Sequence, residues 1–292
     1  MYHTIACTRI VAKITFAVFI SMGNNLNPVF AATPLRIMPV GDSITAGYTD
    51  NPMWATPFTF GYRDTLYTRL TNAGYNIQYV GTSSEPWNNL YGTPTPPPTG
   101  SLDLRTINQD HHRGYGGWNV SAIASQVGGW LNTDNPDVVL LMIGINDIAQ
   151  GSSGNPAGLE NSLNNLVNTI VTTKPNAHLI VAQTTPYASY TDSIVQYNTY
   201  IRDTLVPYWA GQGKHVTTVD MYSSLLTNGQ IDSSLFSNGI NHPGDVAYDR
   251  MANAWFQGVQ TAVPEPNAMV ASGMFVTWML GRRRGLGERN RT

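Results

Sequence analysis

Cysteine is almost absent from this sequence of 292 residues, and its basic residues give no surplus of positive charge. The one cysteine, Cys7, lies near the N-terminus, which excludes a framework of intrachain disulfides and a cysteine-ligated metal site. Charged residues make up 12% of the chain and the formal net charge is −2, so the composition does not predict binding to nucleic acid. A hydrophobic content of 42% is too high for a disordered chain.

Motifs of several other enzyme classes are also missing. The sequence has no Gly-x-Ser-x-Gly elbow of the α/β-hydrolase type and no phosphate-binding loop ending in Lys-Ser or Lys-Thr. His111 and His112 are adjacent, but no third ligand stands at a spacing typical of a metal site. We therefore expect neither a metal nor a cofactor.

The N-terminal residues 1–32 have the pattern of a secretory signal peptide. Two basic residues, Arg9 and Lys13, precede the short apolar run 14–22, which is too short to span a bilayer. The segment 29–31, VFA, fits the small-x-small rule for cleavage, which places the cut after Ala31 or the next residue. An uncleaved N-terminal anchor is the alternative interpretation.

The C-terminal residues 263–292 combine a Pro-Glu-Pro box at 264–266, an apolar stretch at 268–280 and three arginines at 282–284. This order of parts resembles the PEP-CTERM sorting signal. The resemblance implies export by a Gram-negative bacterium, recognition by the PEP-CTERM sorting machinery, and a contact with the membrane only through this segment before processing. A plain C-terminal anchor is the alternative. Between the two ends, residues 33–263 carry a net charge of −7, which argues against binding polyanions.

The central part of the chain alternates between strand and helix patterns. Short apolar runs predict five strands, and apolar residues at helical spacing predict a helix after each of them. The run at 137–143 is almost entirely apolar, as in a central parallel strand that is covered on both faces. We therefore predict an α/β fold, a three-layer α/β/α sandwich with a five-stranded parallel sheet. The expected strands are 35–40, 76–80, 137–143, 178–183 and 215–221, and the expected helices are 62–74, 120–131, 157–173, 191–209 and 245–261.

Polar side chains follow several of these strands, at the edge where sites form in open α/β sheets. Ser43 follows the first strand, Asn146 follows the long apolar strand, and His242 precedes the last helix. A serine hydroxyl needs an adjacent base, which histidine supplies near neutral pH. The tetrahedral intermediate of acyl transfer needs donors that already point at its negative oxygen. The amide of Asn146 and a backbone N–H at Gly114 would fit that need, together with the N–H of Ser43.

Four short blocks around these residues resemble the SGNH, or GDSL, hydrolase superfamily. They are GDS at 41–43, Gly114, GIN at 144–146 and His242. The segments RIMPVGDSIT at 36–45 and DHHRGYGGW at 110–118 are more specifically similar to acetylxylan esterases of carbohydrate esterase family three. The resemblance extends over about residues 35–258. It implies a flavodoxin-like fold, no metal, and hydrolysis of O-acetyl groups from a polysaccharide.

The resemblance also implies roles for individual residues. Ser43 would be the nucleophile and His242 the base, with an oxyanion hole formed by the N–H of Ser43, the N–H of Gly114 and the amide of Asn146. Gly116 is the rival of Gly114, which is favoured because it begins its block.

The sequence departs from the family at the acid that orients the histidine. The family has an aspartate three residues before the histidine, where this chain has Gly239. The segment NGINH at 238–242 is similar to Asp-Gly-Ile-His with Asn238 in place of the aspartate and one inserted residue. Three interpretations stay open: a backbone carbonyl orients His242, Asp232 or Asp245 substitutes for the acid, or the enzyme is impaired. Asn238 is a further candidate for orienting the histidine.

We therefore expect an exported serine esterase that deacetylates a polysaccharide, located at the cell surface or outside the cell. A lipase, lysophospholipase or thioesterase on the same fold is the nearest alternative, because the fold does not fix the substrate. A carbohydrate-binding protein with a decayed site is the alternative from another class. Aromatic residues in the Pro-rich loop after the second strand, Trp87 and Tyr91, are candidates for stacking on sugar rings.

Overall fold

The computed structural model describes residues 33–50, 59–82, 102–151 and 155–263. The signal peptide expected at 1–32 and the sorting segment from 264 onward lie outside the described residues, as do Trp87 and Tyr91. Within the described part, no helix is long and apolar enough to cross a membrane.

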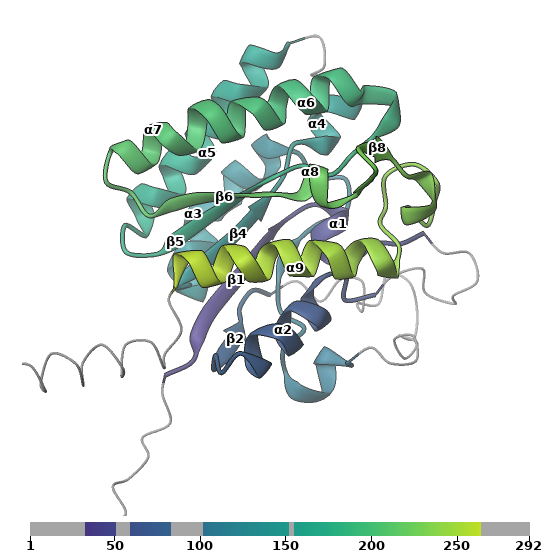
Figure 1. Ribbon diagram of the computed structural model, residues 1–292. Coiled ribbons are helices and arrows are strands. Elements are labelled where there is room, and N and C mark those ends of the chain that lie inside the picture. The colour runs from purple at the N-terminus through teal and green to yellow at the C-terminus, as the bar shows by residue number, and fades with distance from the viewer. Residues whose placement is uncertain (1–32, 51–58, 83–101, 152–154, 264–292) are drawn as a thin grey trace, which may run out of the picture. The chain divides into compact units, whose positions relative to one another are not determined.

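The centre of the fold is a parallel sheet whose main strands follow the order β2-β1-β4-β5-β6 (Figure 1). This order is that of flavodoxin-like folds, so the predicted α/β architecture is confirmed. A sixth strand, β3, pairs with β1 over two residues and was not predicted. The strands are β1 (Leu35–Gly41), β2 (Ile77–Tyr79), β3 (Arg113–Gly114), β4 (Val138–Met142), β5 (His178–Gln183) and β6 (Val216–Asp220).

Helices cover both faces of this sheet. In Figure 1, α9 crosses the near face beside α2, and α3 and α5 lie behind the strands. The predicted helix at 191–209 is continuous in space but contains a π-helical segment at Ile201–Leu205. The long helices are α2 (Arg63–Asn72), α3 (Val120–Asp134), α5 (Pro156–Thr173), α6 (Thr191–Tyr200), α7 (Val206–Gly211) and α9 (Asp245–Ala262).

Apolar packing between α9 and the sheet forms a large part of the core. Met251, Trp255 and Val259 recur along one face of α9 and are fully buried. Gly258 allows the helix to approach β6 closely, since a Cβ atom there would lie 2.5 Å from the Val219 side chain. Helix α9 therefore packs closely against the sheet at β6.

Short helices, turns and one hairpin make up the rest of the described fold. They are α1 (Ser43–Ala46), α4 (Ile145–Ala149), α8 (Met221–Ser224), the hairpin of β7 (Leu226–Thr227) and β8 (Gln230–Ile231), and the 3₁₀ turns η2 (Leu104–Ile107), η4 (Ala188–Tyr190) and η6 (Ser233–Leu235). The strands that precede α1 and α4 are β1 and β4, which are neighbours in the sheet. Both helices therefore start at the same sheet edge, where the strand order reverses and α/β folds place their ligands.

Candidate active site

Ser43 is the first residue of α1, in the tight turn that follows β1. The side chain of Asp42 caps this helix by accepting a hydrogen bond from the N–H of Ile44 at 2.9 Å. Gly47 ends the helix with a φ of 102°, a conformation that favours glycine. The turn holds Ser43 at the strand end with only 6% of its surface exposed.

His242 reaches Ser43 from the loop before α9. Its Nε2 lies 2.9 Å from Ser43 Oγ, across 199 positions of sequence. The loop is closed by a bridge between Phe236 and Pro243 and by a hydrogen bond from the N–H of Ser237 to the carbonyl of His242. The structure therefore brings the two predicted catalytic residues together in the geometry that proton transfer requires.

Asp50, which the sequence analysis missed, contacts the other ring nitrogen of His242. Its Oδ2 accepts a hydrogen bond from Nδ1 of the histidine, at the end of the segment that follows α1. The His242 side chain is 15% exposed and that of Asp50 is 40% exposed. Asp50 has a φ of 54°, in the left-handed region that aspartate tolerates better than most residues.

The carboxylate that contacts His242 is thus that of neither Asp232 nor Asp245, the two candidates in one of the interpretations left open by the sequence. The carboxylate of Asp232 is bound to Thr227 and Ser234. Asp245 is the first residue of α9, and the carboxylate that reaches Nδ1 is that of Asp50. Spacing from the histidine could not reveal it, because Asp50 is 192 positions away.

Asn146 lies at the start of α4, directly after β4. One N–H of its amide donates to the carbonyl of Trp118 at 2.8 Å, which leaves the other N–H for a further acceptor. Asp147 holds the same neighbouring loop, because its carboxylate accepts from the N–H of Val120 at the start of α3. Asn146 is thus held against Trp118 at the end of β4, and β4 neighbours β1, the strand that precedes Ser43.

Gly114, expected to donate to an oxyanion, has its N–H directed to a protein acceptor in this structure. The N–H of Gly114 donates to Nδ1 of His112 at 3.0 Å, and the residue is buried in β3. A Cβ atom there would lie 2.6 Å from the N atom of Ala46, so the glycine is needed for the packing of β3 against α1. The rival Gly116 packs against the ring of Tyr48, where a Cβ atom would lie 2.8 Å from the hydroxyl.

Gly117 is the exposed glycine of this loop. Its φ of 75° favours glycine, and a Cβ atom built on it meets nothing within 4 Å. It directly precedes Trp118, whose carbonyl is bound by Asn146. A glycine two residues before the helix cap Asn119 is the sequence signal that could have identified it.

Burial changes the pKa values of two charged side chains near Ser43, those of Asp42 and Arg63. Desolvation raises the pKa of Asp42 to about 7, and the nearby charge of Asp147 adds to the increase. Arg63 is fully buried, which lowers its pKa, and its guanidinium donates to the carbonyls of Phe60, Ala46 and Asp110. This one side chain thus links the end of α1 to α2 and to the loop that leads into β3.

The adjacent histidines His111 and His112 each contact a protein partner. His112 accepts the hydrogen bond from Gly114, and His111 contacts the side chain of Asn108 at 3.2 Å. Over the described ranges, no group of three or more His, Cys, Asp or Glu side chains is arranged to hold a metal ion.

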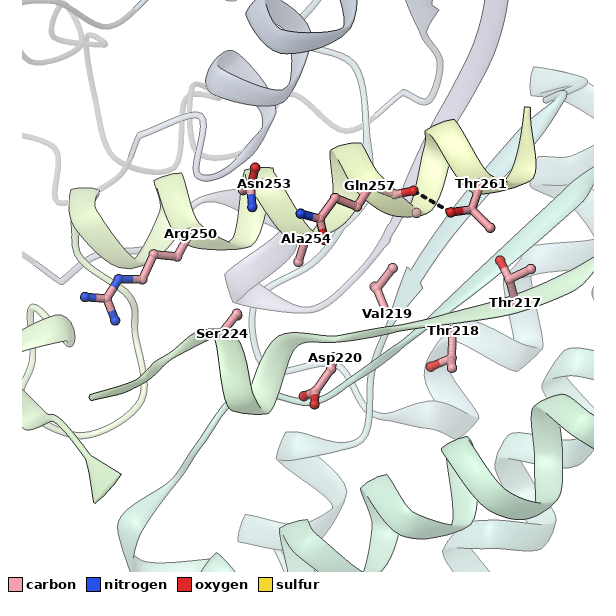
Figure 2. A pocket seen from close by; sticks show the side chains of 11 residues that line it. Thr217, Thr218, Val219, Asp220, Ser224, Arg250, Asn253, Ala254, Gln257 and Thr261 are labelled. Carbon is pink, nitrogen blue, oxygen red and sulfur yellow. Dashed lines mark hydrogen bonds between the residues drawn. The ribbon is translucent and has the colours of Figure 1, made fainter. Parts of the chain in front are cut away.

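A cavity of about 360 Å³ lies apart from these residues, between α9 and the edge strand β6 (Figure 2). Polar side chains such as Thr217, Asp220 and Arg250 line it, and neither Ser43 nor His242 does. We place the chemistry at the Ser43–His242 pair, because among the described residues no histidine lines the cavity to act as a base for its Ser224.

Comparison with known proteins identifies relatives of this chain. Residues 40–250 match the sequence model of the GDSL-like Lipase/Acylhydrolase family. A family 3 carbohydrate esterase from Clostridium thermocellum has a similar structure, with a TM-score of 0.58 and 33% sequence identity, covering 77% of this chain and 94% of that one.

Two curated sequences are also similar. A protein of Acetivibrio thermocellus that carries the name endoglucanase X is 36% identical over 138 residues, which is 47% of this chain and 56% of the relative. A multidomain esterase of Ruminococcus flavefaciens is 26% identical over 253 residues, covering 79% of this chain and 29% of the relative. The chain therefore spans little more than half of one curated relative and less than a third of the other.

Proposed function

The chain belongs to the GDSL-like lipase/acylhydrolase family, and from this premise we propose that it is a serine esterase that removes O-acetyl groups from a polysaccharide. The observation that carries the proposal is the 2.9 Å contact between Ser43 Oγ and His242 Nε2 at the sheet edge. A paired hydroxyl and imidazole are what nucleophilic acyl transfer needs.

The reaction follows from the positions of these two groups. Ser43 Oγ attacks the ester carbonyl while His242 Nε2 takes the hydroxyl proton, and the same proton then passes to the leaving sugar hydroxyl. Water, deprotonated by His242, then attacks the acetyl-serine, the bond between the acyl carbon and Ser43 Oγ breaks, and the proton passes from His242 to Ser43 Oγ as acetic acid leaves. Each half of the reaction returns the histidine to its neutral form.

The negative oxygen of both intermediates needs donors that are already in place. The free N–H of the Asn146 amide and the N–H of Ser43 serve this purpose. Gly117 supplies a third N–H in place of Gly114, because it is exposed and adjoins the carbonyl that Asn146 binds. This change from the expected glycine follows from the use of the Gly114 N–H by His112.

Two features support a sugar substrate. The structural relative with 33% identity is a carbohydrate esterase. Beside Gly117, the partly exposed rings of Tyr115 and Trp118 are stacked with their centroids 4.3 Å apart. Aromatic side chains in the loop that carries Gly117 favour the binding of a sugar ring.

We also propose that the protein is exported, with residues 1–32 removed as a signal peptide and the segment from 264 recognised by PEP-CTERM sorting machinery. Both proposals rest on the sequence patterns at the two ends. Fractionation of the native bacterium, with mass spectrometry of the mature termini, tests them.

Acetate release tests the esterase proposal. The purified protein is given aryl esters of acetate, butyrate and octanoate, and acetylated xylan, beside Ser43→Ala and the control Ser125→Ala on the exposed side of α3. We expect release from the aryl acetate and the xylan that Ser43→Ala abolishes and Ser125→Ala retains.

The other outcomes separate the alternatives. A preference for octanoate would favour a lipase, and release from the aryl acetate alone would retain the mechanism and discard xylan. A folded protein that releases nothing from any substrate would contradict the proposal and favour a binding protein.

A further inference from the structure

The imidazole of His242 is held between two oxygen atoms that come from one short stretch of chain. Ser43 Oγ contacts Nε2, and Oδ2 of Asp50 accepts from Nδ1. We propose that Asp50 is the acid that stabilises His242 during the reaction, and that Asn238 is the positioning residue that holds Asp50 in place. This inference rests on the esterase function proposed above and assigns two further residues to it.

The backbone that leads to Asp50 is anchored to the helix of the nucleophile. The N–H of Tyr48 donates to the carbonyl of Ser43 at 3.0 Å, and the hydroxyl of Tyr248 donates to the carbonyl of Tyr48 at 2.7 Å. Thr49 is fully buried. The backbone that leads to Asp50 is therefore held close to Ser43 by local structure, and the orientation of the Asp50 carboxylate is a separate matter.

Asn238 connects that carboxylate to the histidine loop. Its Oδ1 accepts from the backbone N–H groups of Ile240 and Asn241 at 2.9 Å and of His242 at 3.1 Å. Its Nδ2 donates to Oδ2 of Asp50 at 3.2 Å, the oxygen that also binds the imidazole. A single amide thus shapes the loop that carries the histidine and fixes the acid beside it.

The exposure of Asp50 explains why a positioning residue is needed. With 40% of its side chain in contact with solvent, a carboxylate has many rotamers and hydration partners to choose from. The donor on Asn238 favours the one orientation in which Oδ2 faces the ring. Asparagine at this position supplies a donor that a carboxylate could not.

The proton balance defines what Asp50 does. When Nε2 takes the proton of Ser43, the ring becomes an imidazolium with both nitrogens protonated. Asp50 stays ionised and keeps its hydrogen bond from Nδ1, so no proton moves to it. The proton on Nε2 leaves with the sugar hydroxyl, and the positive charge beside Asp50 disappears.

The first test replaces the acid. Asp50→Asn should lower kcat for aryl acetate by about 10³- to 10⁴-fold, because it removes the charge that stabilises the imidazolium. It should also move the acidic limb of the kcat/KM profile to lower pH. Asp50 binds Nδ1 of the ring, and the ring of Tyr48 lies beside it with its centroid 5.8 Å from that of His242.

The second test separates the two roles of Asn238. Asn238→Asp keeps an acceptor for the three backbone N–H groups but loses the donor to Asp50. Its thermal stability should stay close to that of wild type, while a second carboxylate beside the ring moves the acidic limb to higher pH. Asn238→Ala loses both roles and should lower stability and reduce kcat by about 10- to 100-fold.

Asp232→Asn is the matched control, since it removes a carboxylate whose hydrogen bonds go to Thr227 and Ser234. A proton NMR spectrum gives a readout that does not need turnover: we expect a low-field signal from Nδ1–H of His242 that disappears in Asp50→Asn.

Three outcomes would contradict these proposals. If the wild type is active and Asp50→Asn has the same kcat and the same signal, the acid assignment is overturned. A wild-type pH profile in Asn238→Asp would overturn the positioning role. An inactive wild type that retains the signal would instead contradict the esterase function.

Discussion

Asp42 shows how far the sheet edge departs from an aqueous environment. Asp42, directly before Ser43, is 1% exposed. The hydrogen bond from Ile44 lowers the pKa of its carboxyl, but by less than desolvation raises it. The folded protein therefore favours the protonated carboxylic acid at a pH where the unfolded chain has ionised it.

Asp42→Asn should consequently flatten the pH dependence of stability. Desolvation raises the folded-state pKa from 3.8 to about 7, so wild-type stability is highest below the lower value and is lost as the pH rises through the higher one. The full loss corresponds to roughly 4 kcal/mol, and asparagine keeps the helix cap without the ionisation. Urea unfolding at several pH values across this window checks it.

Asp192→Asn, which changes an exposed carboxylate on α6, is the control for this experiment. Its stability should follow the wild-type curve. If the free energies of unfolding of the wild type and of Asp42→Asn fall in parallel as the pH rises, another group causes the pH dependence.

At the scale of single residues, sequence motifs identified Ser43, Asn146 and His242 as candidates, but did not identify Asp50 and Gly117. Ser43, Asn146 and His242 stand in short motifs directly beside strand ends or helix starts, so their chemistry could be inferred from local order. Asp50 and Gly117 depend on a fold-level contact and on backbone conformation. The first pairs with a histidine 192 positions away, and the second is defined by a φ of 75°.

At the scale of elements, two glycines differ in the space around them that a Cβ atom would occupy. Gly129 lies on the exposed side of α3, where an added Cβ meets nothing within 4 Å. Gly114 lies in β3, where the same atom would press on the backbone of α1.

Gly129→Ala should therefore stabilise the protein by about 1 kcal/mol, since alanine loses less conformational entropy in a helix than glycine does. Gly114→Ala should destabilise it by about 1–3 kcal/mol and reduce activity, because α1 must shift and Ser43 moves with it. Chemical denaturation and ester hydrolysis of both variants check this pair. Equal stability of the two variants would contradict the role of Gly114 in packing.

At the scale of the whole molecule, the prediction of the main sheet was confirmed because each of its strands carries its own signal. The apolar run of β4 has every residue buried, as its pattern indicated. The two residues of β3 are too few to show a strand pattern in the sequence, and β3 is defined by its pairing with β1. Elements created by tertiary contacts are the part of this fold that a sequence pattern does not contain.

The net charge of −7 carried by residues 33–263 leads to a prediction about the substrate. An acetylated polysaccharide with uronic acid groups should be repelled at low ionic strength, when the Debye length is about 30 Å, and much less at about 0.1 M salt, when it is about 10 Å. We expect kcat/KM for such a polymer to rise about tenfold over this range, while that for neutral acetylated xylan changes little. Acetate release at a series of salt concentrations measures both. Faster turnover of the anionic polymer at low salt would show instead that basic side chains beside the site outweigh the overall charge.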